Sequence, residues 1–204
     1  MTNRSLPVTK RPARRALAAD SAAARLARQY KDTLPVKALE HVADLGDQPP
    51  MRILCGAFIG IGLLSGNRHL ARTGVAMLAA HTLATFVKDE VKERVDRTRP
   101  RSAGKPGKDS KPRPGDKTAK EETSFPSGHS AGAAAVARAF ARGYPEHAGK
   151  AYAAAGFLAL AQIPRCAHYP TDVGAGLAIG VAAEAAAERA EATMVEVRKA
   201  VGVR

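Results

Sequence analysis

The sequence predicts an all-α fold: a membrane-embedded helical bundle of about five core helices with an N-terminal helical arm. Three observations favour it. Apolar residues make up 45% of the chain and aromatic residues only 4%, and much of the apolar content is Ala and Gly, which suits closely packed helices. No segment shows the alternation of apolar and polar residues that is typical of a half-buried strand. At 204 residues, the chain has room for one domain.

Residues 1–50 are predicted to form a basic arm. Residues 1–12 hold two prolines and several charges, and we expect them to be disordered. Residues 13–45 are rich in Ala, Leu, Arg and Lys, and Pro35 divides this helical region into two pieces. The arm is open to two interpretations: a basic helix lying on a lipid surface, or a solvated helix of the bundle.

Residues 51–192 are predicted to form the bundle. Its apolar segments are separated by short turns and by one long stretch of Lys, Pro and Gly, which we expect to be a mobile basic loop. A C-terminal tail follows the bundle. The predicted segments are an antiparallel hairpin of helices 51–66 and 70–87, a charged helix from residue 88 that Pro100 ends, the loop 101–123, helices 130–142, 150–163 and 173–190, and the tail 193–204.

The formal net charge of +13 favours anionic partners such as phosphorylated substrates or acidic lipid headgroups. Nucleic acid is not an expected partner, because aromatic residues for stacking are scarce and no nucleic-acid-binding motif is present. Cys55 and Cys166 are far apart in the sequence and have mostly apolar neighbours. Neither a disulfide framework nor a zinc site is therefore predicted.

The first of three motif segments lies in the charged helix. Lys92 and Arg99 are seven residues apart, close to two helical turns, so we expect both cations to share one helix face. Pro100 ends the helix just past them. Taken alone, this segment is also typical of a solvated face of mixed charge.

The second segment is the run SFPSGHS from Ser124 to Ser130. Pro and Gly shape a turn and the Ala run after it is a helix, so Ser127, Gly128 and His129 are predicted at a helix N-terminus. Free backbone N–H groups and the helix dipole favour a bound phosphate there. An ordinary capped helix start is the alternative.

The third segment runs from Pro164 to Asp172. His168 and Asp172 are four residues apart at the start of the last helix. This spacing lets the carboxylate hold one imidazole nitrogen, which sets the tautomer and leaves the other nitrogen free to attack. Such a pair is common in proteins, and its meaning comes from the two other segments.

In this order, the three segments resemble the motifs of the type 2 phosphatidic acid phosphatase family, which also includes bacterial acid phosphatases and vanadium haloperoxidases. The resemblance covers about residues 50–190. It implies a phosphatase that hydrolyses a phosphate monoester or diphosphate. The matching residues are Lys92, Arg99 and Pro100, then Pro126, Ser127, Gly128 and His129, then His168 and Asp172.

The resemblance implies a role for each residue. His168 attacks phosphorus and forms a phosphohistidine, Asp172 orients His168 and balances its charge, and His129 protonates the leaving oxygen and then activates water. Cations neutralise the phosphate oxygens, so neither a metal nor another cofactor is expected. The phosphate-binding residues expected on this basis are Lys92, Arg99, Ser127, Gly128 and Arg165.

One position departs from the family pattern. The family usually has Ser-Arg with the Arg six residues before the nucleophilic His, where this chain has Ala161 and Gln162. Arg165 is the nearest cation, and on a helix positions 162 and 165 lie on neighbouring faces. We therefore hypothesise that Arg165 supplies the missing phosphate contact.

Apolar helices beside a cationic phosphate site suggest a multi-pass enzyme of the inner membrane, with a lipid or polyprenyl phosphate as its substrate. Residues 1–50 and 88–120 carry an excess of Lys and Arg, so the positive-inside rule orients the active site to the cytoplasm. Three alternatives remain open: a peripheral or soluble all-helical relative, because Arg72 and Arg138 fall within the apolar segments; a vanadium haloperoxidase-like enzyme, for which the chain is short; and a basic membrane-surface protein on the same scaffold, non-enzymatic or degenerate.

Overall fold

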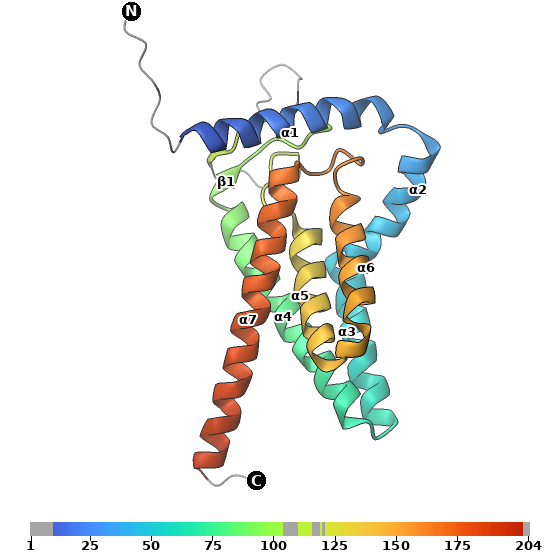
Figure 1. Ribbon diagram of the computed structural model, residues 1–204, viewed down its shortest axis with the longest axis vertical. Helices are drawn as coiled ribbons and strands as arrows, with labels where there is room; N and C mark the ends of the chain where they lie inside the picture. Colours follow the sequence, from blue (N-terminus) through green and yellow to red (C-terminus); the bar gives the residue numbers. More distant parts are fainter. Residues whose placement is uncertain (1–9, 104–109, 116–118, 120, 202–204) are drawn as a thin grey trace, which may run out of the picture.

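The computed structural model describes residues 10–103, 110–115, 119 and 121–201. The predicted all-α fold is confirmed, since the regular structure of these residues is almost entirely helical (Figure 1). Two short strands, β1 (Val95–Asp96) and β2 (Arg113–Pro114), pair antiparallel. The helices are α1 (Lys10–Tyr30), α2 (Leu34–Ala43), α3 (Gln48–Leu64), α4 (Arg68–Lys92), α5 (Gly128–Gly143), α6 (Ala148–Leu160) and α7 (Pro170–Ala200), with 3-10 turns η1 (Asp44–Gly46) and η2 (Pro145–His147).

Helix α5 is the centre of the bundle, and it packs against α4, α6 and α7, while α3 packs against α4. Its buried residues are mostly Ala, and such small side chains let neighbouring helices approach closely. On α7, a Cβ added to Gly176 would lie 2.4 Å from the carbonyl oxygen of Ser127, and one added to Gly180 would lie 2.3 Å from that of Ala131. This close approach holds the start of α7 against the start of α5.

The arm forms two helices outside the bundle. Helix α1 lies across one end of the bundle, and α2 descends from it toward α3 (Figure 1). The predicted division at Pro35 is confirmed, because Pro35 lies in the first turn of α2. Proline is tolerated there, since N–H groups of the first turn have no acceptor within the helix. Of residues 1–12, predicted to be disordered, 1–9 lie outside the described residues and 10–12 belong to α1.

Lys92 and Arg99 do not share a helix. Helix α4 runs without a break from Arg68 to Lys92, and the chain then turns at Glu93. The prediction of one helix face is wrong because the next residues take other backbone partners: β1 pairs with β2, and the Arg99 N–H donates to the carbonyl oxygen of Glu121 at 2.8 Å. These partners follow much later in the chain, so helix periodicity could not reveal them.

The last two helices also differ from their predicted bounds. Helix α6 ends at Leu160, and residues 161–166 form turns instead of further helix. Helix α7 continues to Ala200, so residues 193–200 of the predicted tail are helical, and 202–204 lie outside the described residues. The predicted mobile loop, 101–123, lies partly outside the described residues as well; its described part supplies β2.

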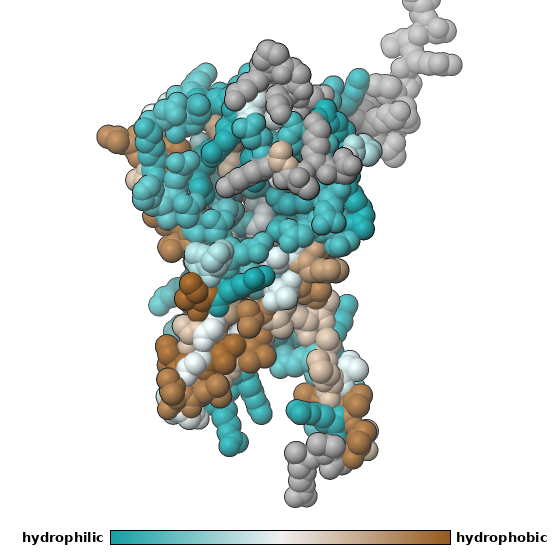
Figure 2. Space-filling model, turned by 180° about the vertical axis from the view of Figure 1, so that it is seen from behind, coloured by the Kyte–Doolittle hydropathy of each residue, from teal (hydrophilic) through white to brown (hydrophobic). Residues whose placement is uncertain are grey.

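The surface divides into a hydrophilic end and an apolar flank. Figure 2 shows hydrophilic residues around the end that carries the arm and apolar residues along the helices farther from it. Within the described residues, α4 is the one helix long and apolar enough to cross a membrane by itself, and α3 is apolar but shorter. Large apolar side chains that are more than half exposed on the bundle include Ile53, Ile61, Leu63 and Leu64 of α3, Val75 and Phe86 of α4, and Leu160 of α6.

Candidate active site

Six of the eight predicted site residues line one cavity at the end of the bundle that carries the arm. The cavity measures about 440 Å³ and lies between the turn before α3, the end of α4, the start of α5 and the turns after α6. Folding thus brings residues of all three motif segments together. The six residues are Lys92, Arg99, Gly128, His129, Arg165 and His168.

His168 lies on the cavity wall with 2% of its surface exposed. Its Nδ1 lies 2.6 Å from the carbonyl oxygen of Ser124. Because a carbonyl oxygen only accepts hydrogen bonds, Nδ1 carries the proton and the lone pair is on Nε2. Burial lowers the pKa of His168 from 6.5 to about 4, and nearby Asp172 offsets this only in part. The ring is therefore neutral near pH 7, as a nucleophile must be.

Asp172 lies behind His168 in the first turn of α7 and is fully buried. Its Oδ2 is 3.8 Å from Nδ1 of His168, beyond hydrogen-bond distance. The same oxygen accepts hydrogen bonds from the Ser124 hydroxyl at 2.5 Å and from the Tyr169 N–H at 2.9 Å. The predicted pair is therefore present, but at a distance longer than a hydrogen bond: Nδ1 of His168 donates to the Ser124 carbonyl, and Asp172 accepts from the Ser124 hydroxyl.

Ser127 is the N-cap of α5, and its side chain serves the helix instead of the cavity. Its Oγ accepts a hydrogen bond from the Ser130 N–H at 3.4 Å, and its own N–H donates to the carbonyl oxygen of Asp172 at 3.0 Å. Ser127 thereby ties the start of α5 to the start of α7. The next two residues, Gly128 and His129, are the ones that line the cavity.

The cavity has an excess of positive charge. Five basic side chains and three carboxylates line it, an excess that favours an anion such as phosphate. The Lys92 ammonium donates to the carbonyl oxygen of Thr123 at 2.8 Å. Burial lowers the pKa of Arg99 from its ordinary value, and the neighbouring cation Arg101 adds to this. The cationic residues are Lys88, Lys92, Arg99, Arg101 and Arg165, and the acidic ones are Glu40, Asp44 and Asp47.

Arg165 also lines the cavity, with 10% of its side chain exposed. Its Nη2 donates to Asp44 at 2.7 Å and its Nη1 to Oε1 of Gln162 at 3.4 Å, while its buried Nε has no hydrogen-bond partner among the described residues. The helix-face argument for positions 162 and 165 is wrong, because α6 ends at Leu160 and both lie in the turns after it. The turn nevertheless brings the two side chains into contact.

His129 stands beside the acidic residues at the start of α3. Its Nε2 lies 3.0 Å from Oδ1 of Asp47. Asp44, Asp47 and His129 have ligand atoms within 4.8 Å of one another, and among the described residues they are the one group that could hold a metal ion. Both carboxylates already have a nitrogen partner, so a metal ion would have to displace these contacts.

Sequence reasoning missed part of the site. Arg97, 1% exposed, lies behind the cavity and pairs with Asp172 and with Asp20 of the arm. Nothing in the sequence distinguishes Arg97 from a cation on a solvated helix. Lys88 could have been found, since it precedes Lys92 by four residues on the same face of α4 and also lines the cavity.

Comparisons with known proteins agree with this fold. Residues 70–190 match the family model of the PAP2 superfamily. The fold is similar to the crystal structure of Aquifex aeolicus LpxE, with a TM-score of 0.62 and 22% identity over 81% of this chain and 92% of that one. It is also similar to a transmembrane PAP2 type phosphatidylglycerolphosphate phosphatase from Bacillus subtilis, with a TM-score of 0.57 and 19% identity over 87% of this chain and 86% of that one. No curated protein matches the chain by sequence.

The matched span covers more than half of the chain and includes the three motif segments that form the cavity. The predicted resemblance is therefore confirmed at the level of the family. This chain belongs to the PAP2 superfamily.

Proposed function

We propose that the protein is a metal-independent phosphatase that hydrolyses a phosphate monoester or diphosphate of a lipid through a phosphohistidine intermediate. One observation carries the proposal: the buried His168 is neutral, with the lone pair of Nε2 available in a cavity rich in cations. Membership of the PAP2 superfamily supports phosphatase chemistry at this site.

In the first step, Nε2 of His168 attacks phosphorus as the bond from phosphorus to the leaving oxygen breaks. The positive charge that develops on the ring is stabilised by the Ser124 carbonyl at Nδ1 and by the nearby Asp172 carboxylate. His129 gives a proton to the leaving oxygen. The surrounding Lys and Arg side chains neutralise the equatorial phosphate oxygens.

In the second step, water attacks the phosphorus of the phosphohistidine and the bond from phosphorus to nitrogen breaks. His129, which lost its proton in the first step, takes one from this water. Inorganic phosphate is released, and His168 returns to its neutral form. Asp47, 3.0 Å from His129, supports the protonated form of this second imidazole, which is present before the first step and forms again in the second.

An apolar groove next to the cavity supports a lipid substrate. The groove measures about 430 Å³ and is lined by α3, α5 and α6, and each of these helices begins or ends next to the polar cavity. On α5, His129 lines the cavity, and Ala133, one helical turn further on, lines the groove. A phosphate held in the cavity would therefore direct an attached acyl or prenyl chain along this groove.

The apolar flank of the bundle supports a membrane location. Exposed Ile, Leu, Val and Phe side chains on α3 and α4 favour lipid over water as their surroundings, and α4 is long enough to span a bilayer. The similar structure from Bacillus subtilis is described as transmembrane. We propose a multi-pass protein of the inner membrane, and the excess of Lys and Arg in residues 1–50 and 88–120 favours an active site facing the cytoplasm.

Phosphate release by the purified protein in detergent tests this proposal. Phosphatidate, phosphatidylglycerol phosphate and polyprenyl phosphates and diphosphates form the panel, and a short water-soluble phosphate monoester serves as the comparison without an apolar chain. We expect at least one lipid phosphate to be hydrolysed faster than the soluble ester, and EDTA to leave the rate unchanged. Activity that EDTA abolishes, or no activity on any substrate, would refute the proposal.

Arg165 is expected to bind phosphate in place of the family Arg that is absent at Gln162. Charge-assisted contacts of this kind contribute about 1.5–3 kcal/mol, so Arg165→Ala should raise KM and the inhibition constant of inorganic phosphate by about 10- to 100-fold. Arg165→Lys should recover part of the loss, because Lys keeps the charge without the planar fork. Arg189→Ala, an exposed Arg on α7, is the control. Unchanged constants in Arg165→Ala would show that Arg165 does not bind phosphate and serves only its contacts with Asp44 and Gln162.

A further inference from the structure

The arm carries a carboxylate into the layer of side chains behind His168. Asp20 is the one acidic residue of α1, and it is 1% exposed although much of that helix faces solvent. Asp20 does not line the cavity and has no part in the two chemical steps above. Burying a charged group is costly unless its partners compensate it, so its contacts indicate what it does there.

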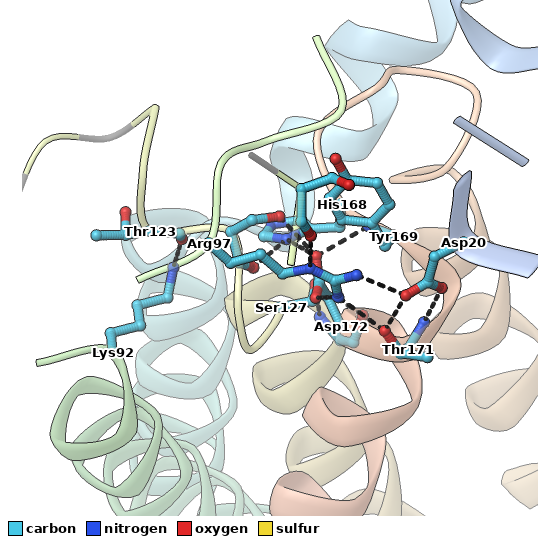
Figure 3. Close-up of polar contacts among 12 residues, drawn as sticks. Asp20, Lys92, Arg97, Thr123, Ser127, His168, Tyr169, Thr171 and Asp172 are labelled. Carbon is cyan, nitrogen blue, oxygen red and sulfur yellow. Dashed lines mark hydrogen bonds and ion pairs between the residues drawn. The ribbon is translucent and has the colours of Figure 1, made fainter. Parts of the chain in front are cut away.

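Three hydrogen-bond donors converge on Asp20 (Figure 3). Its Oδ1 accepts from the Thr171 N–H at 3.0 Å, and its Oδ2 accepts from the Thr171 hydroxyl at 2.5 Å and from Nη2 of Arg97 at 2.6 Å. Thr171 lies in the first turn of α7, where unpaired N–H groups attract a carboxylate. Asp20 therefore ties α1 to the start of the helix that carries Asp172.

Arg97 joins Asp20 to Asp172. While Nη2 donates to Asp20, Nη1 donates to Asp172 and, at 2.7 Å, to the Thr171 hydroxyl. Its Nε donates to the carbonyl oxygen of Ser110 at 3.0 Å. All three nitrogens of the guanidinium thus have partners, which hold this planar group in one orientation.

Two buried carboxylates share this one guanidinium, so the group keeps one net negative charge behind His168. With Arg97 paired to Asp172 alone, that carboxylate would be neutralised and would attract the ring less as positive charge develops on it. Asp20 also binds Nη2 of Arg97, and this contact helps to set the orientation in which Nη1 donates to Asp172. The net charge behind His168 and the orientation of the Arg97 guanidinium therefore both depend on Asp20 of the arm.

We propose that Asp20 is a positioning residue for His168: by sharing Arg97 with Asp172, it keeps that carboxylate oriented and negatively charged behind the imidazole. Helix α1 is then part of the catalytic unit. This inference rests on the proposed phosphohistidine mechanism. Because Asp20 does not line the cavity that would hold the phosphate and the leaving group, we expect it to affect the rate of the chemical step and not the affinity for phosphate.

Asp20→Asn tests the inference, since it removes the charge and keeps the size of the side chain. We expect kcat to fall by about 10- to 100-fold, as when a group that orients a functional histidine is lost, with KM and the inhibition constant of inorganic phosphate within about twofold. Inhibition by orthovanadate, which mimics the transferring phosphoryl group at His168, should weaken by a similar factor. Asp32→Asn, an exposed carboxylate just after α1, should change none of these.

An Asp20→Asn protein that melts like the wild type and keeps its kcat would overturn the inference. A parallel rise in KM and in the phosphate inhibition constant would overturn it too, because it would indicate a disturbed cavity. Should Asp20→Asn fail to fold, Thr171→Val removes the hydroxyl that bridges Asp20 and Arg97 and is held to the same criteria. If activity is lost in His168→Gln but kept in Asp20→Asn, only this inference is contradicted. If the activity of the wild type does not depend on His168, the proposed function is contradicted.

Discussion

Replacing His168 by Gln is expected to lower kcat by about 10⁴-fold or more and to abolish the phosphoenzyme. The lone pair of Nε2 is lost, and with it the proposed nucleophile in the cavity. The Gln side chain amide can still donate to the Ser124 carbonyl, so the loss reports on chemistry and not on folding. Brief reaction with labelled substrate, followed by quenching in alkali, where a phosphorus–nitrogen bond survives, measures the intermediate.

His147→Gln is the matched control for this experiment, because His147 is exposed and lies outside the cavity. It should form the phosphoenzyme like the wild type. Label that persists in His168→Gln would place the nucleophile elsewhere. Turnover without any trapped label in the wild type would instead favour direct attack by water.

Replacing His129 by Gln is expected to lower kcat by about 10²- to 10⁴-fold and to make the phosphoenzyme accumulate. With a good leaving group such as p-nitrophenolate, the first step needs little help from an acid, whereas attack by water still needs a base. The variant should therefore release one equivalent of nitrophenol in a burst and then turn over slowly. Rapid mixing with detection of nitrophenol measures the burst.

With a poor leaving group such as a lipid alcohol, the burst of His129→Gln should vanish, because protonation then limits the first step as well. His147→Gln again serves as the control, and we expect it to behave as the wild type with both substrates. An equal loss of rate with both leaving groups and no accumulation would contradict a role for His129 in proton transfer.

The helices could be predicted from local pattern. Runs of Ala, Gly and Leu between turn residues indicate closely packed helices, and Pro35 marks a helix start that the structure has at Leu34. The predicted bounds of α4, α6 and α7 were less accurate. For α4, the reason is that the charged stretch of residues 88–99 has helical propensity along its whole length. Pairing of β1 with β2 overrides that propensity after Lys92.

The site residues could be predicted by type and order, but not always for the right reason. Lys92 and Arg99 reach the same cavity, one from a helix end and the other from a loop. Arg165 reaches it from a turn and not from a helix face. For Ser127, the alternative of an ordinary helix cap describes its side chain better than a phosphate ligand does.

By itself, the sequence determined which chemical groups are present in the three motif segments: two imidazoles, a carboxylate and several cations, with a helix start between them. Only the tertiary structure decided which charged side chains are buried. Asp20 and Thr171 are 151 residues apart, and they meet because α1 crosses the end of the bundle. Local propensity and spacing report on neighbours within a few residues, whereas the burial of Asp20 and Arg97 depends on how distant helices pack.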